Sequence, residues 1–477
     1  MPSSVSEIVE RCRLNGQPQL AERLLGLVGE PQMRLAAEID EIDLPLVGDL
    51  VKQFAGGSDT SGTLGDITPT NAVPLPRGPK DVMRNREARE RGEGHLQDDK
   101  VALVLLAGGQ GSRLGFDGPK GNYPFAPLSG RTLFDFFAAR IDALRSRYGA
   151  ALPWYIMTST VNDAVTRHTF RAANFFGLDP ESVRFMVQGM LPAVDTSTGQ
   201  ILLEAPDRLA LSPDGHGGLL STLRRSGALD DMASRGVETI FTFQIDNPLL
   251  RIARPEFIGH HVLAGAEMSN LVVRKRSPEE KVGIIAEIGG RTGVIEYSDL
   301  PSELAEQRDE SGDLTYWAGS IAVHCLERSF VEGLTNGGLS LPFHRALKKV
   351  PYLSDAHEMV SPDRQNAIKF ETFLFDALPF ATTTVSLESA REEEFSPIKN
   401  GDGADSPESA RVDMNRQYAR WLNEVGVAVP TDSAGEPVDL EIDPRFALDA
   451  DQLRDVLPNG FAITGPTILS RQPPVSA

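Results

Sequence analysis

The sequence predicts an α/β fold built on a doubly wound, mostly parallel sheet. One observation is an unbroken apolar run at residues 101–106, which is typical of a strand buried on both faces and which ends in glycines. A second is the alternation of apolar strands with amphipathic helices up to residue 245. A third is the apolar run at residues 239–245, which ends in Asp246 and Asn247. Both runs therefore point to the sheet edge where open α/β sheets bind ligands.

The remaining elements follow in order along the chain. Residues 1–52 read as helical with a break near residues 29–31, and residues 81–97 read as a highly charged helix exposed to solvent. Between the two apolar runs we expect strands at 154–159 and 183–187 and helices at 132–148, 164–175 and 219–234. Shorter, alternating strands after residue 270 predict antiparallel additions to the sheet. We divide the chain into a helical region at 1–97, a main domain at 98–400 and a small C-terminal domain at 401–477.

The composition excludes several classes of function. The 477 residues carry a formal net charge of −20, which argues against nucleic-acid binding because a phosphate backbone needs a basic face. Two cysteines, Cys12 and Cys325, are too few for a disulfide framework, and we expect Cys325 in the core. The sequence begins without a signal-peptide pattern, and its longest apolar run is well short of the ~20 residues that span a bilayer. We therefore expect a cytoplasmic protein that does not bind membranes.

A glycine-rich loop follows the first apolar run. Residues 106–115 read Leu-Ala-Gly-Gly-Gln-Gly-Ser-Arg-Leu-Gly, and bare backbone N–H groups of this kind form an anion-binding concavity. Arg113 and Lys120 add two cations, as a phosphate site in an acidic protein requires. The glycine spacing does not fit a dinucleotide fingerprint, and Lys120 lacks the hydroxyl neighbour of a P-loop. The alternative for the loop alone is a tight turn between a strand and a helix.

Four further features suggest a ligand site. Asp246 ends a buried strand, where a carboxylate is costly unless it binds a metal or a partner, and a helix cap or a buried salt bridge is the alternative. Residues 213–218 form a second glycine loop, which could also be no more than the first turn of a helix. Gln188 ends a strand and offers an amide to a base edge. Lys399 could serve phosphate or form an ion pair with one of the glutamates at 392–394.

Together these features resemble the UDP-N-acetylhexosamine pyrophosphorylases, within the type 1 UDP-sugar pyrophosphorylase family. The similar segments occur in the family's order and cover roughly residues 100–400: 106–121, 154–159, 174–180, 188–193, 213–219, 245–247, 272–275, 294–298 and 391–400. The resemblance implies a glycosyltransferase-A-like nucleotidyltransferase domain. It implies a Mg²⁺-dependent enzyme that transfers the uridylyl group of UTP to a sugar 1-phosphate.

The resemblance also implies roles for individual residues. It assigns catalysis to Arg113 and Lys120, which would hold the phosphates, and to Lys399, which would hold the sugar phosphate. It assigns Mg²⁺ to Asp246 and sugar hydroxyls to Glu296. The residues that it assigns to UTP are Leu106, Ala107, Gly108, Gly109, Gln188, Gly215 and Asp246, with Gln188 and Gly215 on the uracil.

Two positions that face the sugar in this family depart from its pattern. The acetylhexosamine enzymes have Asn where this chain has His216 and where it has Ser320, and the UDP-glucose branch has a Gly-His-Gly motif at the first position. N-acetylglucosamine 1-phosphate is the predicted acceptor, and glucose 1-phosphate is the alternative. A non-catalytic UDP-sugar binding protein and a nicotinamide oxidoreductase are the other classes considered, and the second fails on loop spacing. For the oligomeric state a monomer is favoured.

Overall fold

The computed structural model describes residues 3–55, 65–336, 341–354 and 356–471. Part of the predicted N-terminal region, residues 56–64, thus lies outside the described residues. Contacts divide the chain into two compact units. Unit 1 comprises residues 1–65, 188–221 and 340–377, and unit 2 comprises residues 66–187, 222–339 and 378–477. The predicted boundaries at residues 97 and 400 stay predictions, since both units combine segments that are distant in sequence.

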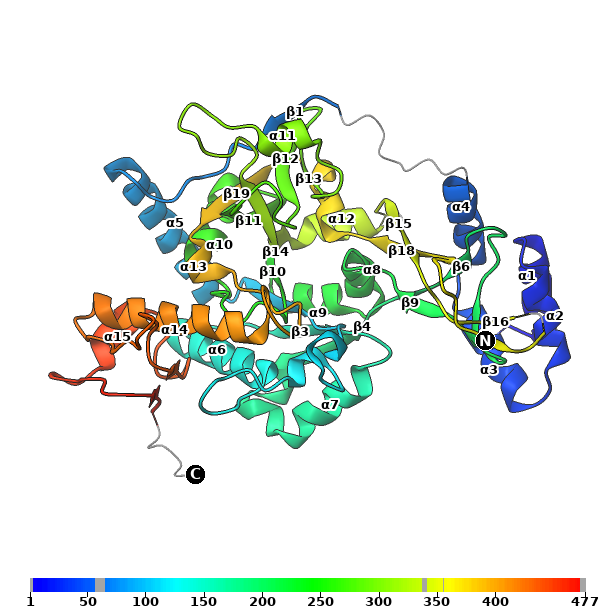
Figure 1. Ribbon diagram of the computed structural model, residues 1–477, viewed down its shortest axis with the longest axis horizontal. Helices are drawn as coiled ribbons and strands as arrows, with labels where there is room; N and C mark the ends of the chain where they lie inside the picture. Colours follow the sequence, from blue (N-terminus) through cyan, green and yellow to red (C-terminus); the bar gives the residue numbers. More distant parts are fainter. Residues whose placement is uncertain (1–2, 56–64, 337–340, 355, 472–477) are drawn as a thin grey trace. The chain divides into compact units, whose positions relative to one another are not determined.

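Unit 2 is built on a ten-stranded sheet (Figure 1). Its order is β1 (Ile67–Pro69), β12 (Ile284–Ile288), β14 (Ala318–Glu327), β10 (Thr239–Gln244), β2 (Val101–Leu106), β3 (Trp154–Thr158) and β4 (Val183–Val187). Three more strands pair beside this path: β11 (Met268–Arg274), β13 (Arg291–Ile295) and β19 (Thr384–Ser389). Strands β10, β2, β3 and β4 are mutually parallel, whereas β14 runs antiparallel to β10. The predicted fold class, a parallel sheet with antiparallel additions, is confirmed.

Helices cover this sheet, and local sequence explains where they begin and end. The Thr132 side chain accepts a hydrogen bond from the Asp135 N–H, 3.3 Å away, and caps α6 (Leu133–Tyr148) as expected. The helix expected at 219–234 is wrong as a single element. It is two helices, α8 (Gly218–Arg225) and α9 (Ala228–Ser234), because Gly227 adopts a left-handed conformation with φ 74° between them. The other helices of this unit are α7 (Asp163–Ala172), α11 (Ser302–Glu306), α12 (Arg328–Asn336) and α13 (Arg391–Glu394).

The charged helix α5 (Pro79–Gln97) is not simply a solvated surface element, as its composition had suggested. It crosses α10 (Pro255–Ala264) at a glycine contact, because a Cβ on Gly92 would come within 1.9 Å of the Pro255 carbonyl oxygen. A Cβ on Gly259 would come within 1.6 Å of the Ala88 carbonyl oxygen. Only glycine permits two helix backbones to approach this closely. One face of α5 is therefore buried and the other carries the exposed charges.

The C-terminal part packs into the same core as the sheet. It consists of α14 (Pro407–Glu424), β20 (Leu440–Ile442), α15 (Ala450–Val456) and β21 (Thr467–Leu469). Tyr418, Trp421 and Leu422 of α14 belong to one buried cluster with Phe241 and Cys325 of the sheet, so the expectation that Cys325 lies in the core is confirmed. Figure 1 shows α14 (orange) running alongside α6 (cyan).

Unit 1 combines four helices with small sheets. The helices are α1 (Val5–Leu14), α2 (Pro18–Gly26), α3 (Glu30–Asp40) and α4 (Leu44–Ala55), so the predicted helical N-terminus has three breaks, not one. Their apolar faces pack on Phe370 of a three-stranded sheet. The strands are β15 (Phe343–Lys348), β18 (Ala367–Thr372) and β6 (Val194–Asp195) in one sheet, with the pairs β5 (Met190–Pro192) and β9 (Leu211–Pro213), β7 (Leu203–Ala205) and β8 (Arg208–Leu209), and β16 (Tyr352–Leu353) and β17 (Met359–Val360).

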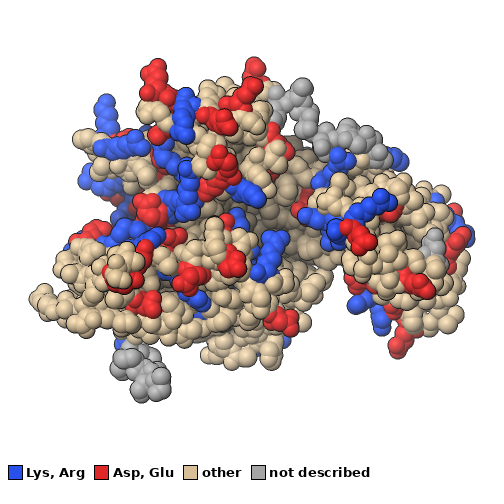
Figure 2. Space-filling model, in the orientation of Figure 1, with Lys and Arg blue, Asp and Glu red and all other residues tan. Residues whose placement is uncertain are grey.

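The distribution of charge on the drawn face agrees with the prediction that this acidic chain does not present a basic face to nucleic acid. On the face drawn in Figure 2, the coloured Lys and Arg side chains are interspersed with Asp and Glu side chains. In the described part of the chain, none of the helices combines the length and the apolar character that a membrane span needs.

Candidate active site

The first glycine loop begins where β2 ends, and side chains from the segment after β3 hold it in place. The Asn162 amide nitrogen donates to the carbonyl oxygen of Ala107 at 2.9 Å, and the Ser159 hydroxyl donates to that of Gly108 at 2.9 Å. Asn162 and Ser159 are 0% and 2% exposed. These contacts turn the loop carbonyls toward the protein interior.

The N–H groups of the same loop remain available. Among the described residues, none accepts a hydrogen bond from the backbone N–H of Gly108, Gly109 or Gln110. The loop closes on itself further along, where the Gly111 N–H donates to the Gly118 carbonyl oxygen at 2.9 Å. Three successive N–H donors without a protein acceptor form a concavity suited to an anion. Leu106 is the last residue of β2, so the loop begins directly at the end of that strand.

Lys120 lies at the centre of a cluster at the same sheet edge. Its ammonium group is 3.6 Å from a carboxylate oxygen of Asp246 and donates to the Ile398 carbonyl oxygen at 3.1 Å. The Ile398 N–H in turn donates to the Asp246 backbone carbonyl at 2.7 Å. The Lys120 and Asp246 side chains are each 16% exposed, so a ligand can reach both. The salt-bridge alternative for Asp246 is thus present, together with an opening for a ligand.

Lys399 follows Ile398 directly and is not paired with the neighbouring glutamates. Glu393 contacts Arg420 at 2.7 Å, and Glu394 contacts Arg254 at 2.9 Å. The Lys399 ammonium group lies 5.9 Å from the centre of the Phe395 ring. Within the described residues no carboxylate forms an ion pair with Lys399, so its charge is available to an anion.

The other predicted residues of unit 2 are placed as follows. Arg113 is exposed on the glycine loop, and none of the described residues forms an ion pair with its side chain. Glu296 and Ser320 both approach Gly283: the Ser320 N–H donates to the Gly283 carbonyl oxygen at 2.8 Å, and a Cβ on Gly283 would lie 3.5 Å from a Glu296 carboxylate oxygen. The structure therefore brings Lys120 together with Asp246, and it places both Glu296 and Ser320 beside Gly283.

Unit 1 contains the second glycine loop, and Gln188 holds it. The Gln188 amide nitrogen donates to Asp214 at 3.0 Å and to the Gly215 carbonyl oxygen at 2.6 Å. Gly215 has φ 85°, and a Cβ there would lie 2.3 Å from the Thr372 carbonyl oxygen. The position therefore requires glycine. Among the described residues, the Gln188 amide oxygen and the Gly215 N–H have no hydrogen-bond partner, so this loop retains one acceptor and one donor.

His216 is a neutral donor in this loop. Its Nδ1 accepts a hydrogen bond from the Leu374 N–H at 3.0 Å, and its ring stacks on Phe373 with centroids 5.3 Å apart. Burial, together with the charge of His344, lowers the pKa of His216 from 6.5 to about 4. Since Nδ1 is an acceptor and the ring is neutral at pH 7, the proton is on Nε2.

The sequence analysis did not predict three residues that hold the two glycine loops in place: Ser159, Asn162 and Thr372. A signal existed for two of them, since Ser159 directly follows a buried strand and Asn162 lies three residues further on, much as Asp246 follows another buried strand. No local signal points to Thr372, whose backbone meets Gly215 from a segment more than 150 residues away.

The donor set fits Mg²⁺ only in one mode. In the described chain no group of three His, Cys, Asp or Glu side chains could hold a metal ion. The described side chains alone therefore do not form a complete coordination site for a metal ion. Asp246 supplies a single, partly exposed carboxylate beside a candidate phosphate site. Mg²⁺ commonly binds through one or two carboxylates plus substrate phosphate oxygens, and these residues fit that mode.

Known proteins resemble the chain over most of its length. The family model described as UTP--glucose-1-phosphate uridylyltransferase matches residues 69–420. The UDP-N-acetylhexosamine pyrophosphorylase-like protein 1 of Homo sapiens is 38% identical over 442 residues, which cover 89% of this chain and 86% of that protein. The UDP-N-acetylglucosamine pyrophosphorylase of Saccharomyces cerevisiae is 36% identical, covering 78% of this chain and 79% of that protein. The solved uridine diphosphate N-acetylglucosamine pyrophosphorylase of Trypanosoma brucei shares the fold, with a TM-score of 0.84 over 98% of both chains at 24% identity.

Proposed function

The chain belongs to the UTP--glucose-1-phosphate uridylyltransferase family and is a nucleotidyltransferase, and we propose that it makes UDP-N-acetylglucosamine from UTP and N-acetylglucosamine 1-phosphate. The acceptor follows from the relatives named UDP-N-acetylhexosamine or UDP-N-acetylglucosamine pyrophosphorylase, which are 38% and 36% identical to this chain.

One observation supports the proposal most strongly. Lys120 contacts both Asp246, which follows β10, and the segment that carries Lys399. Beside it lies a loop with three N–H groups that find no acceptor among the described residues. This arrangement concentrates donors and positive charge at one sheet edge of an acidic protein. Two phosphorylated substrates that react with each other need such a place.

The proposed reaction needs no protein nucleophile. A phosphate oxygen of the sugar 1-phosphate attacks the α-phosphorus of UTP, a new P–O bond forms, and the bond to the β-phosphate oxygen breaks with release of pyrophosphate. Lys120 and Arg113 would hold the UTP phosphates, and Lys399 would hold the attacking phosphate. Catalysis then rests on positioning and on neutralising charge as the two anions approach.

Mg²⁺ is part of the proposal, with Asp246 as its protein ligand. When bound, the ion would supply positive charge to the phosphate oxygens of UTP. The Asp246 carboxylate, held near Lys120, would keep the cation and the lysine on the same group of phosphates. Loss of activity on removal of Mg²⁺ with a chelator, and recovery on its return, would support this part; full activity in the chelator would overturn it.

In this proposal, neutral groups would bind the uracil and the sugar. The Gln188 amide oxygen and the Gly215 N–H offer the acceptor and donor that a uracil edge requires. The Nε2–H of His216 can donate to the carbonyl of an acetamido group. It can equally donate to a sugar hydroxyl, and His216 is the one feature that favours the second candidate, UDP-glucose synthesis.

The test is a pyrophosphate-release assay with UTP and Mg²⁺. N-acetylglucosamine 1-phosphate, glucose 1-phosphate and galactose 1-phosphate would be compared in parallel on the full chain. We expect the highest kcat/KM with the N-acetylglucosamine substrate. If kcat/KM is higher with glucose 1-phosphate, glucose 1-phosphate becomes the proposed acceptor, and the proposed uridylyl transfer stands. Binding of UTP without pyrophosphate release from any of the three would identify a non-catalytic binding protein.

A further inference from the structure

The Asn247 side chain attaches the segment that leads to Lys399 to the end of β10. Its amide nitrogen donates to the carbonyl oxygen of Glu394 at 2.7 Å, and its amide oxygen accepts the N–H of Ser396 at 3.1 Å. Asn247 is 3% exposed. The amide therefore spends a donor and its acceptor on the backbone of one short stretch of chain.

Asn247 directly follows Asp246, the proposed ligand of Mg²⁺. The carbonyl oxygen of Asp246 accepts the Ile398 N–H at 2.7 Å. The two neighbouring residues thus hold the backbone of the same segment at positions 394, 396 and 398. Lys399 is the next residue along, so its backbone starts from a point that is fixed against the end of β10.

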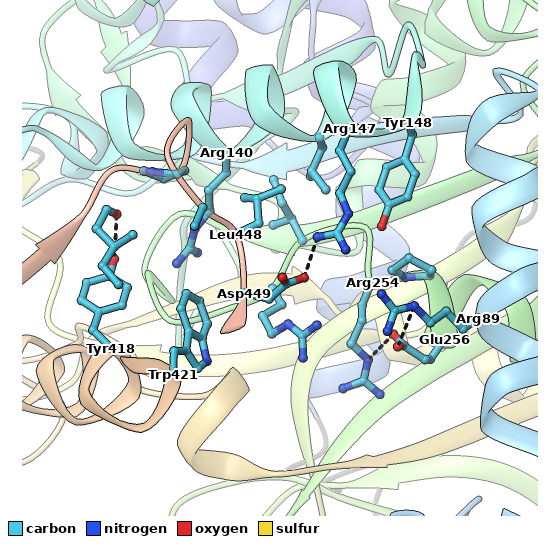
Figure 3. Close-up of a pocket in the computed structure, with 17 residues that line it drawn as sticks. Arg89, Arg140, Arg147, Tyr148, Arg254, Glu256, Tyr418, Trp421, Leu448 and Asp449 are labelled. Atoms are coloured by element: carbon cyan, nitrogen blue, oxygen red, sulfur yellow. Dashed lines mark hydrogen bonds and ion pairs between the residues drawn. The ribbon is translucent and has the colours of Figure 1, made fainter. Parts of the chain in front are cut away.

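The buried carboxylate of Glu394 fixes the start of this segment. It accepts hydrogen bonds from the Arg251 N–H at 3.0 Å and from the Arg254 guanidinium at 2.9 Å. Arg251 and Arg254 also line a pocket with an empty volume of about 630 Å³, its open mouth included, together with arginines of α5 and α6. Figure 3 shows Arg254 in this pocket beside Glu256, with 3.6 Å between the charged groups. The start of the segment is therefore held by residues that soon follow Asn247 in the sequence.

The position of Lys399 relative to Asp246 matters for the proposed reaction. Asp246 would lie with Mg²⁺ at the phosphates of UTP, and Lys399 would hold the attacking phosphate. A misplacement of about 1 Å between reacting groups can cost about 10²-fold in rate. A buried amide with two hydrogen bonds leaves the segment less freedom than the backbone contact of Ile398 alone. The side chain that fixes this segment therefore also fixes the separation of the two proposed ligands.

A buried asparagine can also serve the fold alone, and the chain contains such a case. Asn415 of α14 is 7% exposed, donates to the Asp439 carboxylate at 3.1 Å and accepts the Leu440 N–H at 3.1 Å. It holds the start of β20 as Asn247 holds residues 394–396. Both asparagines should contribute to stability because each satisfies buried polar groups. Only Asn247 lies between two residues of the candidate active site.

We propose that Asn247 is a positioning residue of the uridylyl transfer, which sets the separation between Asp246 and Lys399. This role rests on the proposed function. Asn247 acts through Lys399 and needs no contact of its own with either substrate.

The test is steady-state pyrophosphate release by the full chain, together with calorimetric titration of UTP in the presence of Mg²⁺. In Asn247→Ala the segment loses both side-chain contacts, and Lys399 is free to shift. We expect kcat to fall about tenfold and KM for N-acetylglucosamine 1-phosphate to rise about tenfold, while Kd for UTP changes less than about twofold. Asn415→Ala is the matched control and should leave all three constants near those of the unaltered chain.

A second variant keeps the volume of the side chain, which guards against a failure of Asn247→Ala to fold. Asn247→Asp retains the acceptor for the Ser396 N–H, but it places an oxygen opposite the Glu394 carbonyl oxygen in place of the donor. Repulsion between the two oxygens should displace the same segment. KM for the sugar 1-phosphate should therefore again rise more than Kd for UTP.

Two results would overturn the positioning role. One is an equal change of kcat and KM in Asn247→Ala and Asn415→Ala, and the other is an equal loss of affinity for UTP and for the sugar 1-phosphate. Failure of the proposed function gives a different result, since the unaltered chain would then release no pyrophosphate with any sugar 1-phosphate. The role of Asn247 would be wrong in that case as well.

Discussion

The two glycine loops of this molecule are held by different kinds of contact. In the first, residues 107–115, polar side chains from the end of a neighbouring parallel strand take the carbonyl groups, and Lys120 brings positive charge beside the open N–H groups. In the second, residues 213–218, the Gln188 amide and the Thr372 backbone fix the chain, and His216 stacks on an aromatic ring.

This difference separates two tasks. The first loop combines donors with a cation and a carboxylate, and such groups bind phosphates but do not distinguish one phosphorylated compound from another. The second loop combines neutral donors and acceptors in a fixed shape, which is what discrimination between bases or sugars needs. We therefore expect changes in the first loop to affect turnover and changes in the second to affect stability and selectivity.

The largest effect is expected from Lys120→Ala. Removal of a preorganised cation from a reacting phosphate commonly costs about 10²–10³-fold in kcat, and the loss should be seen in pyrophosphate release with all acceptors alike. The matched control is Lys100→Ala, which removes a lysine paired with Glu238 at 2.9 Å away from the loop. Turnover of Lys120→Ala close to that of the control would contradict the division of tasks.

Gly215→Ala should be the most destabilising change in the second loop. The added Cβ would meet the Thr372 carbonyl oxygen at 2.3 Å, and φ 85° is unfavourable for alanine. Strain and overpacking together predict a loss of roughly 2–4 kcal/mol in the free energy of unfolding, measured by denaturant titration. Gly94→Ala is the control, because a Cβ there meets nothing within 4 Å. Equal stability of the two variants would show that the close approach at Gly215 is unimportant.

Asn162→Ala tests the support of the first loop. The change leaves the Ala107 carbonyl and the Ser159 N–H without their buried partner, which predicts a loss of about 1–3 kcal/mol of stability. Because the loop carbonyls would be free to turn, KM for UTP should rise more than it does in Gly94→Ala. An unchanged KM for UTP would mean that the loop keeps its shape without Asn162.

His216 should contribute to acid sensitivity. Its pKa is about 4 in the folded protein and ordinarily 6.5, so between these values the unfolded chain binds a proton that the folded chain does not. This contribution to stability is therefore present above pH 6.5 and is lost as the pH falls toward 4. His216→Asn should lose less stability over that interval, measured by denaturant unfolding at several pH values. An identical pH profile for both proteins would contradict a neutral, half-buried His216.

The smallest effect expected is on sugar preference. His216→Asn replaces a lone donor with a group that both donates and accepts, as an acetamido group requires. The ratio of kcat/KM for N-acetylglucosamine 1-phosphate to that for glucose 1-phosphate should rise, by about tenfold at most. A fall in this ratio would show that the Nε2–H of His216 itself recognises the acetamido carbonyl.

The central sheet could be predicted because its signals are local. Runs such as 101–106 and 239–245 are apolar throughout because both faces are buried, and the polar residues that follow them must lie at one edge. The predictions of individual helices were wrong where a single glycine mattered more than the apolar and charged pattern around it. Gly227 divides the helix expected at 219–234, and the glycine contact at Gly92 buries one face of a helix that composition assigned to solvent.

The candidate site likewise has features that the sequence determined and features that only the tertiary structure decided. The sequence by itself determined the glycine loop, the carboxylate at the end of β10 and the need for local cations, since each follows from residue type beside a buried strand. Only the tertiary structure decided that Asn162 turns the loop carbonyls inward and that Lys120 contacts Ile398. It also decided that Lys399 forms no ion pair with the adjacent described glutamates, which contact other residues. It alone brought arginines from three segments, α5, α6 and residues 251–254, around one pocket. The physical reason is that these contacts join segments tens to hundreds of residues apart, and their geometry depends on how the whole core packs rather than on any local pattern.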